Sequence, residues 1–135
     1  MASLDDPGVV ALLDSPKPNH AVVSTLNEDG SIHSTVVWVD VQDGRLAVNS
    51  AVGRTWPSNL ERDPRITVTV YDEGNPYDYV EVRGTATGTT EGADAHVDRL
   101  AKRYLGLDSY PYHRPEEQRI TYVVDPTRVR HQKQR

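Results

Sequence analysis

Residues 49–60, with the sequence NSAVGRTWPSNL, place the end of a predicted strand, a turn and the start of a predicted helix in direct succession. The strand ends in small residues, Gly53 allows the turn, and the helix begins near Pro57. Small residues let a ligand approach the backbone, Arg54 offers a planar cationic group, and the helix start offers free N–H groups. The stretch therefore indicates a cradle for a phosphate-bearing ligand. The alternative is an ordinary strand-to-helix turn with a surface arginine.

Short β-rich segments separated by turn signals lie on both sides of this stretch. Residues 27–30 and 42–44 each contain an Asp-Gly pair, which predicts a meander of antiparallel hairpins. Gly84 and Gly88 fall within one long strand region and predict bulges or bends, which a closing barrel requires. The predicted strands are residues 20–26, 32–41, 46–50, 65–71, 77–90 and 119–124, with a further short strand after Pro126.

Helices are predicted at three places between these strands. Asp6 and Pro7 indicate the start of the first helix, which ends before Pro16. The second covers about residues 57–62, and the third covers residues 91–105, where apolar residues recur at helical spacing. The whole pattern is typical of a mainly β (α+β) fold, an antiparallel β-barrel with flanking helices.

The composition is that of a globular protein, with 36% hydrophobic residues, seven Tyr and two Trp. We expect a single domain over residues 1–135, with a basic tail from about residue 128 that is solvated and frayed. The formal net charge of −5 argues against a nucleic-acid partner, and no apolar run approaches the length of a membrane span. The absence of cysteine and of a secretory signal predicts a cytoplasmic location.

Motifs for metal binding and for hydrolytic catalysis are absent. None of the five histidines stands at metal-ligand spacing from another, so no metal site is predicted. The sequence has no Gly-x-Ser-x-Gly, Gly-x-Gly-x-x-Gly or P-loop pattern. An enzyme with this sequence would leave the difficult step to a bound cofactor, and no catalytic residue is assigned.

Two ordered motifs carry a family resemblance. Residues 54–65 read Arg-x-x-Pro-x-Asn-Leu-x-Arg-Asp-Pro-Arg, and residues 75–84 read Asn-Pro-Tyr-x-Tyr-Val-Glu-Val-Arg-Gly. Residues 91–96, 104–106 and 110–115 continue the match. Together they resemble the split β-barrel flavin/deazaflavin reductase family, which is also described as pyridoxamine 5′-phosphate oxidase-like. Within it they are most similar to the actinobacterial, F420-dependent (FDOR-B-type) branch.

This resemblance implies a fold, a cofactor and a reaction. The fold is a six-stranded antiparallel split β-barrel that forms a homodimer, with the cofactor in a groove at the subunit interface. The implied function is that of an F420-dependent reductase, which transfers a hydride from the reduced deazaflavin to a conjugated C=C or imine-type acceptor. The alternatives are an FMN-dependent oxidase or reductase of the same fold, and a non-catalytic dimer that binds a cofactor or haem.

The resemblance also implies which residues contact the cofactor. Arg54 is expected to bind the phosphate, whereas Asn59 either binds it or stabilises the turn. Tyr77 and Tyr79 share one face of their strand and reach the groove of the partner or pack at the interface. Arg114 is expected at the cofactor tail or at an acidic substrate. The full set of implied cofactor-binding residues is Thr35, Val36, Val37, Ser50, Ala51, Arg54, Thr55, Trp56, Asn59, Tyr77, Tyr79 and Arg114.

Two positions depart from the family pattern. Trp56 stands where many members have Lys, and Ser58 stands where an Arg is usual. Arg54 is then the main local cation, which implies a looser grip on the phosphate or a different ligand, such as FMN or haem. The Trp56 indole either stacks on the cofactor or packs beneath the helix. Trp38 is expected in the core or at the dimer interface.

Overall fold

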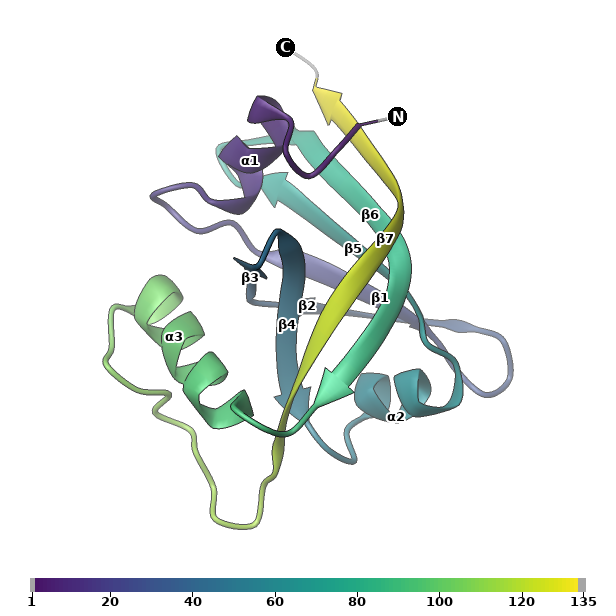
Figure 1. Ribbon diagram of the computed structural model, residues 1–135, viewed down its shortest axis with the longest axis vertical. Coiled ribbons are helices and arrows are strands. Elements are labelled where there is room, and N and C mark those ends of the chain that lie inside the picture. The colour runs from purple at the N-terminus through teal and green to yellow at the C-terminus, as the bar shows by residue number, and fades with distance from the viewer. Residues whose placement is uncertain (1, 134–135) are drawn as a thin grey trace.

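The computed structural model describes residues 2–133, which form three helices and one seven-stranded antiparallel sheet (Figure 1). The helices are α1 (Pro7–Leu13), α2 (Thr55–Arg62) and α3 (Ala93–Leu105). The strands are β1 (Ala21–Leu26), β2 (Ile32–Val37), β3 (Val39–Gln42), β4 (Arg45–Ala51), β5 (Arg65–Asp72), β6 (Asn75–Thr89) and β7 (Arg119–Lys133). This arrangement confirms the predicted class, a mainly β fold with an antiparallel sheet and flanking helices. Within these residues, none of the helices has the length and apolar character needed to cross a membrane.

The order of the strands shows that the sheet curls. The order is β2-β1-β5-β6-β7-β4-β3, so β2 and β3 lie at opposite edges. Only Trp38 separates these two strands in the chain. Consecutive Cα atoms are about 3.8 Å apart, so the Cα atoms of Val37 and Val39 can be at most about 7.6 Å apart. The sheet must therefore bend until its two edges come together at Trp38.

The prediction of one strand over residues 32–41 was wrong, because this run forms two strands, β2 and β3, and the sheet therefore has seven strands where six were expected. Both predicted Asp-Gly hairpins are present, as β1–β2 and β3–β4. They do not form a meander, because β2 and β3 pair with different neighbours at the two edges of the sheet. The run from Ile32 to Gln42 contains neither Gly nor Pro, so nothing local marks the change of neighbour at Trp38.

Gly84 and Gly88 have different roles in β6. The pairing of β6 with β7 shifts register between Arg83 and Gly84, which confirms the predicted bulge at Gly84. A Cβ atom at Gly84 would lie 2.1 Å from the backbone oxygen of Asp125. At Gly88 the pairing is regular, so of the predicted bulge or bend there is no bulge at this position. A Cβ at Gly88 would instead lie 2.6 Å from the ring of Tyr122, which fills that space.

The strand β7 is longer than predicted and includes most of the basic tail. It continues through Pro126 to Lys133, and Arg128 and Arg130 pair with residues of β6. The prediction of a frayed tail from residue 128 is thus wrong for residues 128–133. Residues 134–135 lie outside the described part of the chain. Pro126 is tolerated because β4 pairs with β7 only up to Val123, and the bulge of β6 and β7 lies beside the proline.

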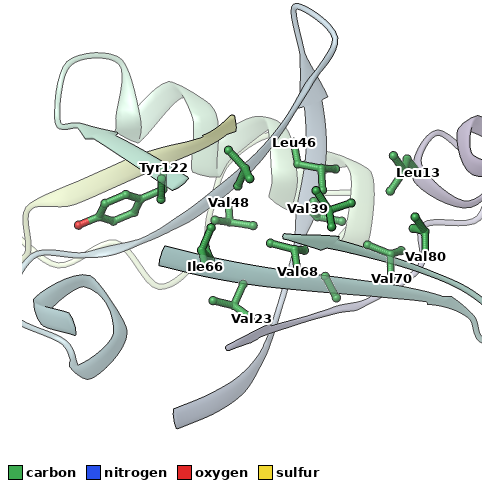
Figure 2. Packing of buried hydrophobic residues seen from close by; sticks show 14 of the residues in the cluster. Leu13, Val23, Val39, Leu46, Val48, Ile66, Val68, Val70, Val80 and Tyr122 are labelled. Carbon is green, nitrogen blue, oxygen red and sulfur yellow. The ribbon is translucent and has the colours of Figure 1, made fainter. Parts of the chain in front are cut away.

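The core fills the inside of the curled sheet. Inward-facing residues of successive strands, such as Val23, Val68 and Val80, are fully buried, and Figure 2 shows them among the packed side chains. Burial of one such side chain contributes about 1.5–3 kcal/mol. Trp56 and Leu60 join this cluster from α2. The core therefore holds α2 in place and with it the turn that carries Arg54.

We expect Gly84→Ala to lower the free energy of unfolding by about 1–3 kcal/mol, because its methyl group would collide with the backbone of Asp125. Gly74→Ala is the control, since its methyl group would meet only the side chain of Asp72 at 3.3 Å. Urea denaturation of both variants measures the difference. Equal stability of the two variants would contradict this account of the bulge.

Candidate functional site

A cavity of about 690 Å³ lies between the edge strand β2, the end of β4 and the first turn of α2. Small-molecule sites commonly have volumes of about 300–1,000 Å³, so its size suits a cofactor. Residues of α3, of the segment 106–118 and of the start of β7 complete the wall. The lining residues are His20, His33, Thr35, Val36, Val37, Trp38, Asn49, Ser50, Gly53, Arg54, Thr55, Trp56, Val97, Leu100, Tyr110 and Arg119.

Seven of the twelve residues expected to bind the cofactor line this cavity. They come from two segments that the link at Trp38 brings close together: β2 supplies one wall, and the β4–α2 connection supplies the facing one. The seven are Thr35, Val36, Val37, Ser50, Arg54, Thr55 and Trp56. Their binding to a cofactor stays a prediction.

Ala51 and Asn59 are not among the residues that line the cavity, and both make hydrogen bonds within the protein. Ala51 is buried, and its carbonyl oxygen accepts a hydrogen bond of 3.2 Å from the backbone N–H of Arg54. Asn59 is buried on α2, where its side-chain amide donates to Thr25 Oγ1 at 3.0 Å and to Asn27 Oδ1 at 2.9 Å. These bonds tie α2 to β1 and to the turn after it. The structural alternative given for Asn59 therefore describes its contacts in this chain.

The structure does not bring Tyr77, Tyr79 or Arg114 to the cavity of the same chain. Both tyrosines belong to the first part of β6, which lies at the α1 end of the molecule, whereas α2 lies at the other end (Figure 1). Tyr77 is exposed, and Tyr79 pairs with Tyr71 and Gln132. Arg114 lies in a separate groove beside α3.

Arg54 lines the cavity and is also part of an ion pair. Its Nη2 donates to Glu117 Oε2 at 2.8 Å, while Arg119 Nη1 donates to Glu117 Oε1 at 2.7 Å. Hydrogen bonding from Arg119, helped by the charges of both arginines, holds the pKa of the Glu117 carboxyl below its usual value. The alternative of an arginine paired with an acidic neighbour is thus present. The Arg54 side chain remains about half exposed, which leaves donors for a ligand.

Arg119 is a second cation in the wall, and sequence reasoning placed it only at the start of a strand. Its side chain is 6% exposed, and its Nε donates to Asn49 Oδ1 at 2.9 Å. Its guanidinium also lies over the Tyr110 ring, 5.1 Å from the centroid. A signal exists in hindsight, because Leu46–Ala51 is a run of apolar and small residues, as in a strand covered on both faces. A polar side chain from the paired strand must then find its partners inside the protein.

A buried polar network continues from Asn49 under α3. The Asn49 amide donates to the Ala93 carbonyl at 3.0 Å and lies 3.2 Å from His96 Nδ1. His96 is buried, with Nδ1 2.9 Å from Thr121 Oγ1 and Nε2 2.9 Å from Asp40 Oδ1. These distances fit the tautomer in which Nδ1 accepts from the Asn49 amide and Nε2 donates to the Asp40 carboxylate. This network fastens α3 to β4 and β7 behind the cavity.

The two tryptophans form parts of the cavity wall while they pack against other aromatic rings. Trp56 is 5% exposed and lies 5.6 Å from Tyr122, centroid to centroid, so it packs beneath the helix and does not obstruct the cavity. Trp38 stacks on Tyr104 at 5.4 Å and meets the edge of Tyr110 at 6.0 Å. The rings of Trp38 and Tyr110 therefore support each other beside the opening.

The segment 106–118 carries Tyr110 and is anchored to α3 by Asp98. Asp98 Oδ1 accepts the backbone N–H of Tyr110 at 2.8 Å and lies 2.8 Å from His113 Nε2. The hydrogen bond from the Tyr110 backbone, followed by that from His113, lowers the pKa of Asp98. The Asp98 carboxylate thus fixes the backbone of Tyr110, while Trp38 and Arg119 contact its ring.

The arrangement suits a planar ring with an anionic arm. Cations and hydroxyl groups gather at the β4–α2 end, and apolar and aromatic side chains line the rest. The free N–H groups of the first turn of α2 add donors beside Arg54. Within residues 2–133, no group of three or more His, Cys, Asp or Glu is placed to hold a metal ion.

Comparison with known families identifies the chain. The model of the pyridoxamine 5′-phosphate oxidase family matches residues 8–133. The chain belongs to the pyridoxamine 5′-phosphate oxidase family. A search of curated proteins gave no match.

Solved structures place this family member among split barrels. The structure of an F420 reductase is similar, with a TM-score of 0.76 and 26% identity over 90% of this chain and 94% of that one. An FMN-binding protein from Nostoc punctiforme, related to pyridoxamine 5′-phosphate oxidase, has a TM-score of 0.65 and 14% identity over 97% and 84%. A putative pyridoxamine 5′-phosphate oxidase from Listeria innocua has a TM-score of 0.66 and 17% identity over 91% and 94%. The predicted split-barrel fold is confirmed.

We expect Asp98→Ala to speed hydrogen exchange at the Tyr110 amide about tenfold, because the charged acceptor is lost. The pKa of Asp98 is lowered by folding, so the anchor is complete above the ordinary value of 3.8 and is lost as pH falls through the lower folded value. Native protein, corrected for intrinsic exchange, should therefore lose protection only at acidic pH. Asp94→Ala, one turn earlier on α3, is the control, and equal exchange in both variants would contradict the anchor.

Proposed function

We propose that this protein binds the deazaflavin F420 in the cavity and acts as an F420-dependent reductase. The observation that carries the proposal is the meeting of seven expected cofactor-binding residues around one cavity, with Arg54 at the start of α2. The similarity to an F420 reductase along nearly the full length of both chains supports it.

Reduced F420, when bound, would supply a hydride to a conjugated C=C or imine-type acceptor. The residues of the chain would bind the cofactor and orient its ring. Thr35, Val36 and Val37 would lie along the ring, while Arg54, with Ser50 and Thr55, would hold the phosphate-bearing arm. The apolar and aromatic part of the wall would keep water from the ring. No described side chain is assigned the role of proton donor.

FMN in the same cavity is the second candidate. Trp56 and Ser58 stand in place of two usual basic residues, so the wall has fewer cations than a highly charged arm would favour. Side-by-side equilibrium titration with F420 and FMN distinguishes the two, and the absorption spectrum of the purified complex identifies the bound ring. Tight binding without turnover, tested with several enone and quinone acceptors, would indicate a non-catalytic carrier of a cofactor or haem.

We also propose that the protein forms a homodimer. Ile32 and Val36 expose apolar side chains on the edge strand beside the cavity, with exposed fractions of 69% and 62%. Tyr77 and Tyr79 lie outside the cavity of their own chain and would reach that of the second copy. Sedimentation equilibrium should give twice the chain mass of 15.1 kDa, and Ile32→Glu should shift the protein toward monomer. A monomer at micromolar concentration would contradict the proposal.

We expect Arg54→Ala to weaken F420 binding about 10–100-fold, because a charge-assisted hydrogen bond to the phosphate is lost. The rate of the chemical step at saturation should change much less. Arg45→Ala is the matched control, since Arg45 is similarly exposed and pairs with Asp125 at 2.7 Å. Unchanged affinity in Arg54→Ala would remove this residue from the site.

A further inference from the structure

Glu117 is placed behind the cationic part of the cavity wall. Its two oxygens accept hydrogen bonds from the two arginines that line the cavity, Arg54 at 2.8 Å and Arg119 at 2.7 Å. Its side chain is 12% exposed, and it is not among the lining residues. The carboxylate therefore lies outside the lining and holds the two arginines, which a ligand in the cavity would meet.

This contact reduces the positive charge that a ligand meets. Two guanidinium charges and one carboxylate charge leave a net charge of +1 at this end of the cavity. The lining residues themselves, all within the described part of the chain, include no Asp or Glu. Two histidines, His20 and His33, also line the cavity, and His20 has its own carboxylate partner in Glu73. Glu117 is thus the anion that most directly offsets the two arginines.

The charge of the wall decides which anion is bound best. The attraction of an anion to the wall grows in proportion to its charge, whereas the cost of removing it from water grows with the square of the charge. A singly charged group is neutralised by a net charge of +1. A doubly charged group would retain one uncompensated negative charge in a partly buried site.

On the basis of the proposed function, we infer that Glu117 determines which charge on the ligand arm the cavity binds best. It makes a phosphodiester with one negative charge the preferred anion over a phosphomonoester dianion. Glu117 is in this sense a specificity-determining residue that acts through Arg54 and Arg119 without touching the ligand.

Three flavins with the same ring system and ribityl carbon chain but with different charges on the side chain provide the test. At pH 8 riboflavin has no charge on its side chain, riboflavin 4′,5′-cyclic phosphate has one negative charge, and FMN has about two. Glu117→Gln removes the carboxylate charge and keeps the shape of the side chain. We expect this variant to leave the affinity for riboflavin unchanged. Its affinity for the cyclic phosphate should rise roughly tenfold, and its affinity for FMN should rise by roughly the square of that factor. The exposed neighbour Glu116→Gln changes the net charge of the chain equally and should shift none of the three affinities.

The same comparison with F420 and its chromophore lacking the phosphate arm extends the test to the deazaflavin ring. Glu117→Gln should raise the affinity for the complete cofactor only. An equal change in affinity for charged and uncharged ligands would show that Glu117 has a merely structural role. No change in any affinity would show that the carboxylate charge does not affect the ligand. Either result overturns the inference and leaves the proposed function standing. If none of the ring compounds binds the native protein, the proposed function fails and the inference fails with it.

Discussion

A single residue, Trp38, connects the two edge strands of the sheet, and this short link determines the shape of the molecule. Because β2 and β3 are at opposite edges, the sheet has to curl around the valine-rich core to let Val37 and Val39 be near neighbours. The same link places the wall made by residues 35–38 opposite the end of β4 and the start of α2. The cavity is thus a direct consequence of how the sheet closes.

The link is itself held from the side by α3. Tyr104 stacks on Trp38, and its hydroxyl accepts the Val39 N–H at 3.1 Å and donates to the Asn19 carbonyl at 2.5 Å. Burial raises the pKa of Tyr104, so the hydroxyl stays protonated at neutral pH. At the start of α3, the Ala93 carbonyl accepts a hydrogen bond from the Asn49 amide, which also lies 3.2 Å from His96 Nδ1. One helix therefore fixes both the closing residue and the strand that faces it across the cavity.

Much of the secondary structure follows from local sequence, but the order of the strands does not. Turn residues such as Asp43 and Gly44 locate hairpins because their conformational preference is local. The edge-to-edge crossing at Trp38 leaves no such mark, since both sides of it have the same β-forming composition. The passage of β7 through Pro126 also depends on where β4 stops pairing, which is a property of the assembled sheet.

The candidate site shows the same division. Arg54, Ser50 and Thr55 could be predicted because one short segment and a family resemblance place them together. Glu117 could not, and Arg119 could be found only through the strand that it pairs with, because both reach this end of the cavity only when β7 pairs with β4 and the segment 106–118 folds back. The net charge of +1 at this end of the cavity is therefore a tertiary property, because it arises from two arginines and one glutamate and not from the single cation that the motif alone suggests.

A crystal structure of the protein grown with saturating F420 tests the central claim most directly. The account predicts the ring beside Thr35–Val37 and the phosphate of the arm within hydrogen-bonding distance of Arg54. An empty cavity, or a cofactor bound on another face of the sheet, would contradict it.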